Sequence, residues 1–291
     1  MPGIKWKRYW NMLKDEILRV LEDERAKPIS GQVLADRFGV SRNAVWKVIN
    51  QLKEEGHSIR SDGKKGYCLE ESSDVLSVPG IRNYLQSPEL SVEVYSEIDS
   101  TNNEAKRRLG AGESRNLLLV ADKQTAGRGR IGHTFYSPEH TGIYMTLSIE
   151  LPMPLYQPER ITLAAAVAVV RAVQPYLTEE LRLKWVNDIF YKDLKVCGIL
   201  SEGITDLETG LIQHAIVGIG LNVRPADFPP ELREIAGSLE LERPSRNEIV
   251  GRIVNSLEEL YRDLTNDDYI REYMEYSMHP EKVKEFLKIN G

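Results

Sequence analysis

The chain has 291 residues, 41% of them hydrophobic and 28% charged, with a formal net charge of −6, which is the composition of a globular protein long enough for two domains. Its longest apolar stretch, around residues 161–170, is far short of a membrane span, and no apolar leader with a cleavage site opens the chain, so we expect a cytoplasmic protein without a membrane partner. The five histidines lack metal-ligand spacing, and Cys68 and Cys197 fall in separate predicted domains, so we expect neither a protein-built metal site nor a disulfide.

Positive charge is concentrated at the N-terminal end. Residues 1–70 hold 14 Lys and Arg against 10 Asp and Glu, a balance of +4, whereas the remaining residues have a balance of −10. A small basic domain joined to an acidic body indicates nucleic-acid contact at one end of the molecule only.

The first seventy residues have the pattern of a winged helix-turn-helix. Apolar spacing predicts helices over 12–21, 31–38 and 42–55, the last two preceded by capping serines and separated by a turn at Gly39. Residues 59–69 then predict a β-hairpin with a basic, glycine-rich tip, which is typical of a wing.

In such a fold the second helix of the pair enters the major groove of DNA. We therefore assign DNA contact to the exposed early positions of that helix and to the wing tip: Arg42, Asn43, Lys47, Lys64 and Lys65. Trp46 is ambiguous between core and surface. A three-helix packing or protein-interaction module is the alternative, and the basic wing disfavours it.

Residues 71–88 read as a linker, with Pro79-Gly80 beside a short helical segment at 81–85. An alternating strand follows over 91–98, and then Asp99-Ser100-Thr101-Asn102. This motif predicts the capped start of a helix. Its hydroxyls and amide are also suited to a small polar ligand.

Residues 124–132 form a glycine-rich, basic segment after a strand-like run at 116–120. Gly127 to Gly132 spells G-x-G-x-x-G, but a dinucleotide fingerprint must open a helix, and the aromatic, β-branched sequence that follows continues as strand. What remains is a glycine loop whose Arg128 and Arg130 suit carboxylate and phosphate oxygens. We expect this loop to be mobile when empty; a flexible basic surface loop is the alternative.

Lys184-Trp185-Val186-Asn187-Asp188 lies between two short apolar runs. The pattern predicts a strand, a tight turn at Lys192-Asp193, and a second strand through Leu200. Such a hairpin aims Asp188 and Lys195 at one pocket. Taken alone, a surface hairpin with solvated charges explains the pattern equally well.

Together these motifs resemble the biotin–protein ligase family, whose pattern is D-S-T-N, Q-x-x-G-R-G-R-x-G, K-W-P-N-D, a lysine before G-I-L-x-E, and G-x-G-x-N. The chain has each in order, the last two at 195–202 and 218–222, and the resemblance covers about residues 90–265. The N-terminal segment resembles the winged helix with which some members repress the biotin operon. The resemblance implies an α/β (α+β) catalytic domain with a mixed sheet, preceded by a winged helix-turn-helix.

The resemblance also implies a two-step reaction. Biotin and ATP, with Mg²⁺ carried by the ATP, form biotinyl-5′-AMP, and a lysine of a biotin carboxyl carrier protein then attacks the acyl carbon. Joining two anions needs fixed positive charge, which would come from Arg128, Arg130 and Lys195. Asp188 would orient or deprotonate the incoming lysine, with hairpin capping as its alternative role.

The other site residues follow from the same resemblance. Biotin contacts are expected from Ser100, Thr101, Asn102, Gln124, Arg128, Gly129, Arg130, Lys195, Gly198 and Gly218. Adenylate or ATP contacts are expected from Arg130, Phe135, Asn187, Lys195 and Asn222, with Asn222 on the adenine. Gly198 and Gly218 are expected to lie against the ligand, because a larger residue would fill its space.

The chain departs from the family pattern in three places. Val186 replaces the usual proline, and Ile131 and Phe135 stand where a basic residue and tryptophan are common. After residue 275 the family usually continues into an SH3-like β domain of roughly fifty residues. Here the helical pattern of 281–287 predicts a missing or divergent domain, with an expected cost in ATP affinity and acceptor docking.

We therefore expect a winged helix at 1–70, a linker at 71–88, a catalytic domain at 89–275 and a short divergent tail at 276–291. The implied function is a ligase that biotinylates the carrier protein of acetyl-CoA carboxylase or a related carboxylase and also represses biotin genes. The alternatives are a biotin-sensing repressor with weak or no ligase activity and a lipoate or octanoyl transferase. The intact GRGR loop and Lys195 disfavour the transferase.

We finally expect the ligand to promote a homodimer. The adenylate would order the glycine loop, and strands 117–120 and 143–149 would present a sheet edge for two-fold pairing. Two winged helices spaced in this way would read a palindromic operator.

Overall fold

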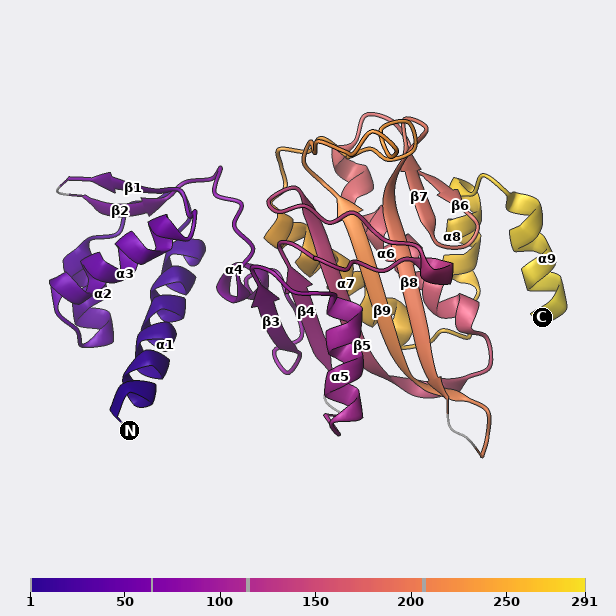
Figure 1. Ribbon diagram of the computed structural model, residues 1–291, viewed down its shortest axis with the longest axis horizontal. Coiled ribbons are helices and arrows are strands. Elements are labelled where there is room, and N and C mark those ends of the chain that lie inside the picture. Colours follow the sequence, from indigo (N-terminus) through magenta and orange to yellow (C-terminus); the bar gives the residue numbers. More distant parts are fainter. Residues whose placement is uncertain (1, 64, 114–115, 206–207, 291) are drawn as a thin grey trace. The chain divides into compact units, whose positions relative to one another are not determined.

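The computed structural model describes residues 2–63, 65–113, 116–205 and 208–290. The chain divides into two compact units, Met1–Tyr84 and Leu85–Gly291 (Figure 1). The boundary lies inside the segment 71–88, where a short helix, α4 (Val78–Arg82), begins earlier than the expected 81–85.

The first unit is a winged helix-turn-helix, as predicted. Besides α4, its helices are α1 (Pro2–Asp23), α2 (Gly31–Phe38) and α3 (Arg42–Glu54), and its wing is the antiparallel hairpin β1 (Ile59–Asp62) and β2 (Gly66–Leu69). Ser30 and Ser41 cap α2 and α3 by accepting from Gln32 and Ala44 amides. Gly39 closes α2 at φ 63°, a conformation that costs glycine little.

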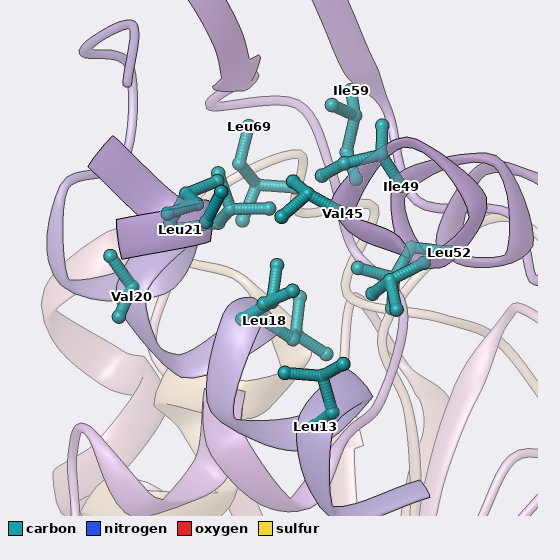
Figure 2. Close-up of a cluster of buried hydrophobic side chains, with 13 residues drawn as sticks. Leu13, Leu18, Val20, Leu21, Val45, Ile49, Leu52, Ile59 and Leu69 are labelled. Atoms are coloured by element: carbon teal, nitrogen blue, oxygen red, sulfur yellow. The ribbon is translucent and has the colours of Figure 1, made fainter. Parts of the chain in front are cut away.

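One apolar core holds the three helices to the wing (Figure 2). Leu18 and Leu21 of α1, Ile49 of α3, and Ile59 and Leu69 of the wing are all buried within it. Helix spacing of three and four residues brings the α1 and α3 side chains to one stripe each, so the amphipathic pattern of the sequence accounts for this packing.

His57, between α3 and β1, is buried without a partner for its Nδ1 atom among the described residues. Burial lowers its pKa to about 4. An unfolded histidine titrates near 6.5, so between these values the unfolded chain binds the extra proton. The contribution of neutral His57 to the free energy of unfolding is therefore complete above about pH 6.5. It is lost as the pH falls toward 4, by at most about 3 kcal/mol.

Urea unfolding of the full chain across this pH range tests the prediction. A His57→Gln variant carries no titrating proton at this position and should lose that part of the pH dependence. Parallel pH profiles for the two proteins would contradict it.

The second unit is built on a seven-stranded mixed sheet. Its strands are β3 (Ser91–Tyr95), β4 (Leu117–Ala121), β5 (Gly142–Leu155), β6 (Arg182–Lys184), β7 (Asp188–Tyr191), β8 (Leu194–Thr205) and β9 (Ile212–Asn222). Their order is β3-β4-β5-β9-β8-β7-β6, with β3 and β4 parallel and the other neighbours antiparallel. The predicted mixed sheet is thus confirmed.

The predicted dimer edge is wrong. β4 is paired with β3 and β5, and β5 with β4 and β9, so both strands are interior and their backbone groups already have partners. The edge strands are β3 and β6. The prediction failed because the sequence of segments 117–120 and 143–149 indicates strands but does not indicate which strands pair with them on either side.

Helices cover both faces of this sheet (Figure 1). α5 (Thr101–Gly110) packs on β4, β5 and β9, while α6 (Pro158–Val173) and α7 (Arg246–Tyr261) pack on the opposite face. The apolar stretch at 161–170 is the middle of α6, buried between the sheet and α7. Two short 3-10 turns, η1 (Arg130–Gly132) and η2 (Gln174–Tyr176), complete the connections.

The C-terminal segment is helical and docked on the sheet edge. α8 (Asp268–Tyr276) and α9 (Pro280–Asn290) follow α7, which confirms the helix expected at 281–287. Between them the Met278 amide donates to the Leu183 carbonyl of β6 (2.8 Å). None of the helices in the described part of the chain is long and apolar enough to cross a membrane.

Candidate active site

The strand register places a hollow on the α5 face of the sheet. One row of neighbours runs across Asp188, Gly198, Gly220 and Tyr144, and the next runs across Leu200, Gly218 and Thr146. Neighbours in a row share a face. The glycines therefore leave a depression there, between the start of α5 and the loop of residues 124–135.

This depression is a cavity of about 290 Å³. Every residue assigned from the sequence to biotin, adenylate or catalysis lines it, with the exception of Asn222. These lining residues are Ser100, Thr101, Asn102, Gln124, Arg128, Gly129, Arg130, Phe135, Asn187, Asp188, Lys195, Gly198 and Gly218. Residues from four separate parts of the chain thus meet at one place.

A polar wall is held in place by hydrogen bonds among its own side chains. The Gln124 Oε1 atom accepts from the amide (2.9 Å) and the hydroxyl (3.2 Å) of Thr101. The Asn102 Nδ2 atom donates to the Leu200 carbonyl (3.3 Å), and Thr146 Oγ1 lies 2.7 Å from Asn102 Oδ1. Side chains fixed before a ligand arrives lose little entropy on binding it.

The glycines also make room for side chains, and the expected contact of Gly218 with the ligand stays a prediction. A Cβ atom at Gly218 would lie 2.0 Å from Asn102 Oδ1, so the missing side chain accommodates the Asn102 amide. At Gly220 it would lie 2.6 Å from the Phe135 ring, and at Gly198 3.2 Å from the same ring. Gly220 was not assigned from the sequence, although the G-x-G of 218–220 contains it.

A chain of charged and amide groups crosses the cavity. The Arg130 guanidinium donates to Asn187 Oδ1 (3.0 Å), and Asn187 Nδ2 donates to Asp188 Oδ1 (2.9 Å). The same Asp188 oxygen lies 2.7 Å from Lys195 Nζ. Both members of this ion pair are about two-thirds buried or more, so they act on each other through a less polar medium than water.

The glycine loop covers the cavity and leads into β5 after the 3-10 turn, so a dinucleotide-binding helix is excluded here. Arg128 donates to Asn103 Oδ1 (2.9 Å), and the Gly129 amide donates to the His133 carbonyl (2.7 Å). Ile131, at the tip, is 92% exposed and has φ 55°, which is costly for a β-branched residue. That the loop is mobile without ligand stays a prediction.

Asn222 lies outside the cavity wall. It is buried, and its Nδ2 atom donates to the Gly237 carbonyl (2.9 Å). The segment that contains Gly237 also holds the backbone of Lys195, because the Lys195 amide donates to the Ile235 carbonyl and the Lys195 carbonyl accepts from the Gly237 amide. Asn222 thus supports Lys195 indirectly, through Gly237. The expected contact of Asn222 with adenine stays a proposal.

Sequence reasoning missed the apolar lining. Met145, Ile199, Leu200 and Ile219 line the cavity from β5, β8 and β9. Ile199, Leu200 and Ile219 belong to the motifs at 198–202 and 218–222, which could have indicated them, whereas Met145 lies outside every motif and only strand register could have found it. Among the described residues, no group of three or more His, Cys, Asp and Glu is placed to hold a metal ion.

In the first unit, the predicted DNA-contacting residues of α3 are exposed: Arg42, Asn43 and Lys47. Trp46 is 52% exposed, which places it on the surface rather than in the core. Lys65 is exposed in the wing turn, 3.9 Å from Asp62 Oδ2, and Lys64 lies outside the described residues.

Both units match known protein families. The sequence profile of the Biotin/lipoate A/B protein ligase family matches residues 94–222, and an HTH domain profile matches residues 14–68. The bifunctional ligase/repressor BirA of Bacillus subtilis is 35% identical over 258 residues, which are 86% of this chain and 79% of the relative. The protein of the same name from Escherichia coli is 31% identical over 194 residues, or 67% of this chain and 59% of the relative.

Solved structures of biotin protein ligases share the fold. The biotin protein ligase of Aquifex aeolicus, in complex with biotin and ATP, superposes with a TM-score of 0.50 at 25% identity, over 65% of this chain and 79% of that one. The ligase of Leishmania major with biotinyl-5-AMP superposes with a TM-score of 0.52 at 23% identity, which supports the fold.

Proposed function

Because this chain belongs to the biotin–protein ligase family, we propose that it activates biotin with ATP as biotinyl-5′-AMP and passes the biotinyl group to a lysine of a biotin carboxyl carrier protein. One observation carries the proposal: Lys195, Asp188 and Arg130 meet a polar wall of Thr101, Asn102 and Gln124 in a single cavity. The cations would meet the phosphate, and the fixed amides would meet the ureido group.

In the first step a biotin carboxylate oxygen attacks the α-phosphorus of ATP, and the bond to pyrophosphate breaks. Lys195, and Arg128 and Arg130 from the glycine loop, would offset the negative charge that gathers on the phosphate. We propose that Mg²⁺ enters with the triphosphate, whose oxygens are the hard ligands that this ion prefers. The Phe135 ring, against Gly198 and Gly220, would lie beside the nucleotide.

In the second step the amine nitrogen of the acceptor lysine bonds to the acyl carbon, and the bond from that carbon to the phosphate oxygen breaks, which releases AMP. The attacking amine must first lose a proton. Asp188, only partly buried and already adjacent to Lys195, would orient the incoming ammonium and accept that proton. Capping of the hairpin does not by itself require this ion pair.

The decisive assay combines the full chain with biotin, ATP, Mg²⁺ and a biotin carboxyl carrier domain. Pyrophosphate exchange measures adenylate formation, and the mass of the carrier domain measures transfer. We expect both. Adenylate without transfer would point to a defective acceptor step, and no adenylate would leave the biotin-sensing repressor as the function. Transfer of a lipoyl or octanoyl group in place of biotin would favour the transferase.

We also propose that the protein represses biotin genes, in the cytoplasm where ATP and operator DNA are found. The exposed Arg42, Asn43 and Lys47 of α3 support this role, because these residue types contact base edges and phosphates. Replacing Lys47 with alanine should weaken operator binding and reduce the salt slope of the affinity by about 1, the value for one lost phosphate contact. A fluorescence-anisotropy titration at several salt concentrations measures both.

We propose, finally, that the adenylate promotes self-association. The β4 and β5 edges are not available for it, so pairing would use another surface. Two copies are needed to place two winged helices on a palindromic operator. With a non-hydrolysable adenylate analogue, self-association measured by sedimentation and operator affinity measured by titration should both increase. An unchanged monomer with unchanged DNA affinity would leave a ligase whose winged helix is not coupled to its ligand.

A further inference from the structure

Thr146 of β5 carries a buried hydroxyl that supports the polar wall of the cavity. The residue is 0% exposed and does not itself line the cavity. Its Oγ1 atom lies 2.7 Å from Asn102 Oδ1 and 2.8 Å from Thr101 Oγ1, so both oxygens are within reach of its proton. A hydroxyl has a single proton, and Thr146 can therefore donate to only one of them at a time.

These contacts belong to a row of four oxygen atoms. The row runs from Asn102 Oδ1 through the hydroxyls of Thr146 and Thr101 to Gln124 Oε1, and its last contact is the longest, at 3.2 Å. Both ends are amide oxygens, which can only accept. The two hydroxyl protons must serve three contacts, so one contact always lacks a proton. The row can therefore accept one further donor.

Rotation of the Asn102 amide cannot supply the missing proton. Its Nδ2 atom already donates to two acceptors, the Leu200 carbonyl and Glu202 Oε2, each at 3.3 Å. Lys106 Nζ lies 2.9 Å from the other Glu202 oxygen and holds this carboxylate in place. A rotated amide would turn the Asn102 oxygen toward both acceptors and leave all three oxygens without a donor.

The Gln124 amide is fixed in the same way. Its Oε1 atom accepts from the Thr101 amide (2.9 Å), and its Nε2 atom donates to Ser137 Oγ (3.1 Å). That hydroxyl donates its own proton to the Phe135 carbonyl (2.9 Å), so it can only accept from Gln124. Gln124 Oε1 is thus always an acceptor, and Gln124 lines the cavity, where a ligand can meet it.

A ligand that brings an N–H group to Gln124 Oε1 would complete the row. The Thr101 proton can then turn from its 3.2 Å contact to Thr146, and the Thr146 proton can turn to Asn102. We propose that Thr146 is a positioning residue for substrate recognition, whose hydroxyl takes up the Thr101 proton and opens Gln124 to an N–H donor of the substrate. This inference rests on the proposed function and adds a buried residue of β5 to it.

The row would select among acyl substrates by their donors. The cyclic urea of biotin carries N–H groups beside a carbonyl, whereas the dithiolane of lipoate and a plain alkyl chain carry none. A site built to hydrogen-bond a donor rejects an analogue without one, because its buried acceptor is then left unpaired. Thr146 thus contributes to a preference for a urea within a family whose profile covers both biotin and lipoate ligases.

Thr146→Val tests the inference, because it keeps the shape of the side chain and removes the hydroxyl. The Thr101 proton then has no acceptor other than Gln124 and stays on it. Biotin affinity should fall by about tenfold, the effect of one lost hydrogen bond, and Thr146→Ser, which keeps the proton, should restore it. Calorimetric titration of biotin into the full chain measures both. Thr146→Ala gives the same contrast with serine if the valine variant does not fold.

A double variant separates this role from a merely structural one. Adding Thr101→Val to Thr146→Val removes the proton that blocks Gln124, so part of the lost biotin affinity should return. If the two side chains acted only through packing, the second change would lower the affinity further.

Ser148→Ala is the matched control, two residues along the same strand and therefore on the same face. Its hydroxyl lies 2.8 Å from His214 Nε2, outside the cavity lining, so its removal should lower Tm without a selective loss of biotin affinity. Wild-type affinity in Thr146→Val overturns the inference, and so does a double variant that binds biotin more weakly than Thr146→Val. A wild-type chain that does not bind biotin overturns the proposed function itself.

Discussion

Lys195→Ala lowers the rate of adenylate formation by roughly 100-fold or more, the usual effect of losing a preorganised charge at a transition state. The ammonium is held for this task by the backbone bonds to Ile235 and Gly237 and by Asp188, 2.7 Å away. Biotin affinity should fall less, because Thr101, Asn102 and Gln124 form a separate wall that keeps its own hydrogen bonds. Pyrophosphate exchange gives the rate, and calorimetry gives the affinity.

Lys192→Ala is the matched control for charge. Lys192 lies in the turn of the same hairpin, is exposed, and places its ammonium over the Tyr191 ring, outside the cavity. It should leave both quantities unchanged. A Lys195→Ala protein with near-normal exchange would mean that this lysine does not meet the phosphate.

Gly218→Ala weakens biotin binding by about tenfold to a hundredfold, the effect of losing one or two buried hydrogen bonds. The new Cβ would lie 2.0 Å from Asn102 Oδ1, so the amide must leave its place between Thr146 and the Leu200 carbonyl. Because the change adds a single methyl on an interior strand, the loss should appear mainly in biotin affinity, with a smaller fall in Tm.

A double-mutant cycle identifies the cause. Asn102→Ala removes the group that the methyl would strike, so adding Gly218→Ala to it should cost little further affinity. Calorimetric titration of biotin into the four proteins measures the coupling. Additive losses would show that the Gly218 methyl acts on something other than Asn102.

Local chemistry determined much of this protein from its sequence. Capping serines at 30 and 41, the glycine at 39 and the turn at 192–193 each depend on neighbours close in the chain, and the structure has all of them as predicted. The same holds for the motifs of the site, since residue type and order alone pointed to a cation-rich polar pocket. Asn103 and His133, which hold the glycine loop, carry no such signal.

Only the tertiary structure decided which groups share a surface. β4 and β5 read as candidate edge strands, yet pairing with β3 and β9 makes both interior. Gly218 was expected to contact the ligand, and the structure adds that its missing Cβ makes room for Asn102, more than a hundred residues earlier in the chain. Tyr273 has no motif at all, and its position beside Trp185 follows from how α8 docks on the sheet. Strand order, register and helix docking depend on contacts between residues far apart in sequence, and no local pattern records those contacts.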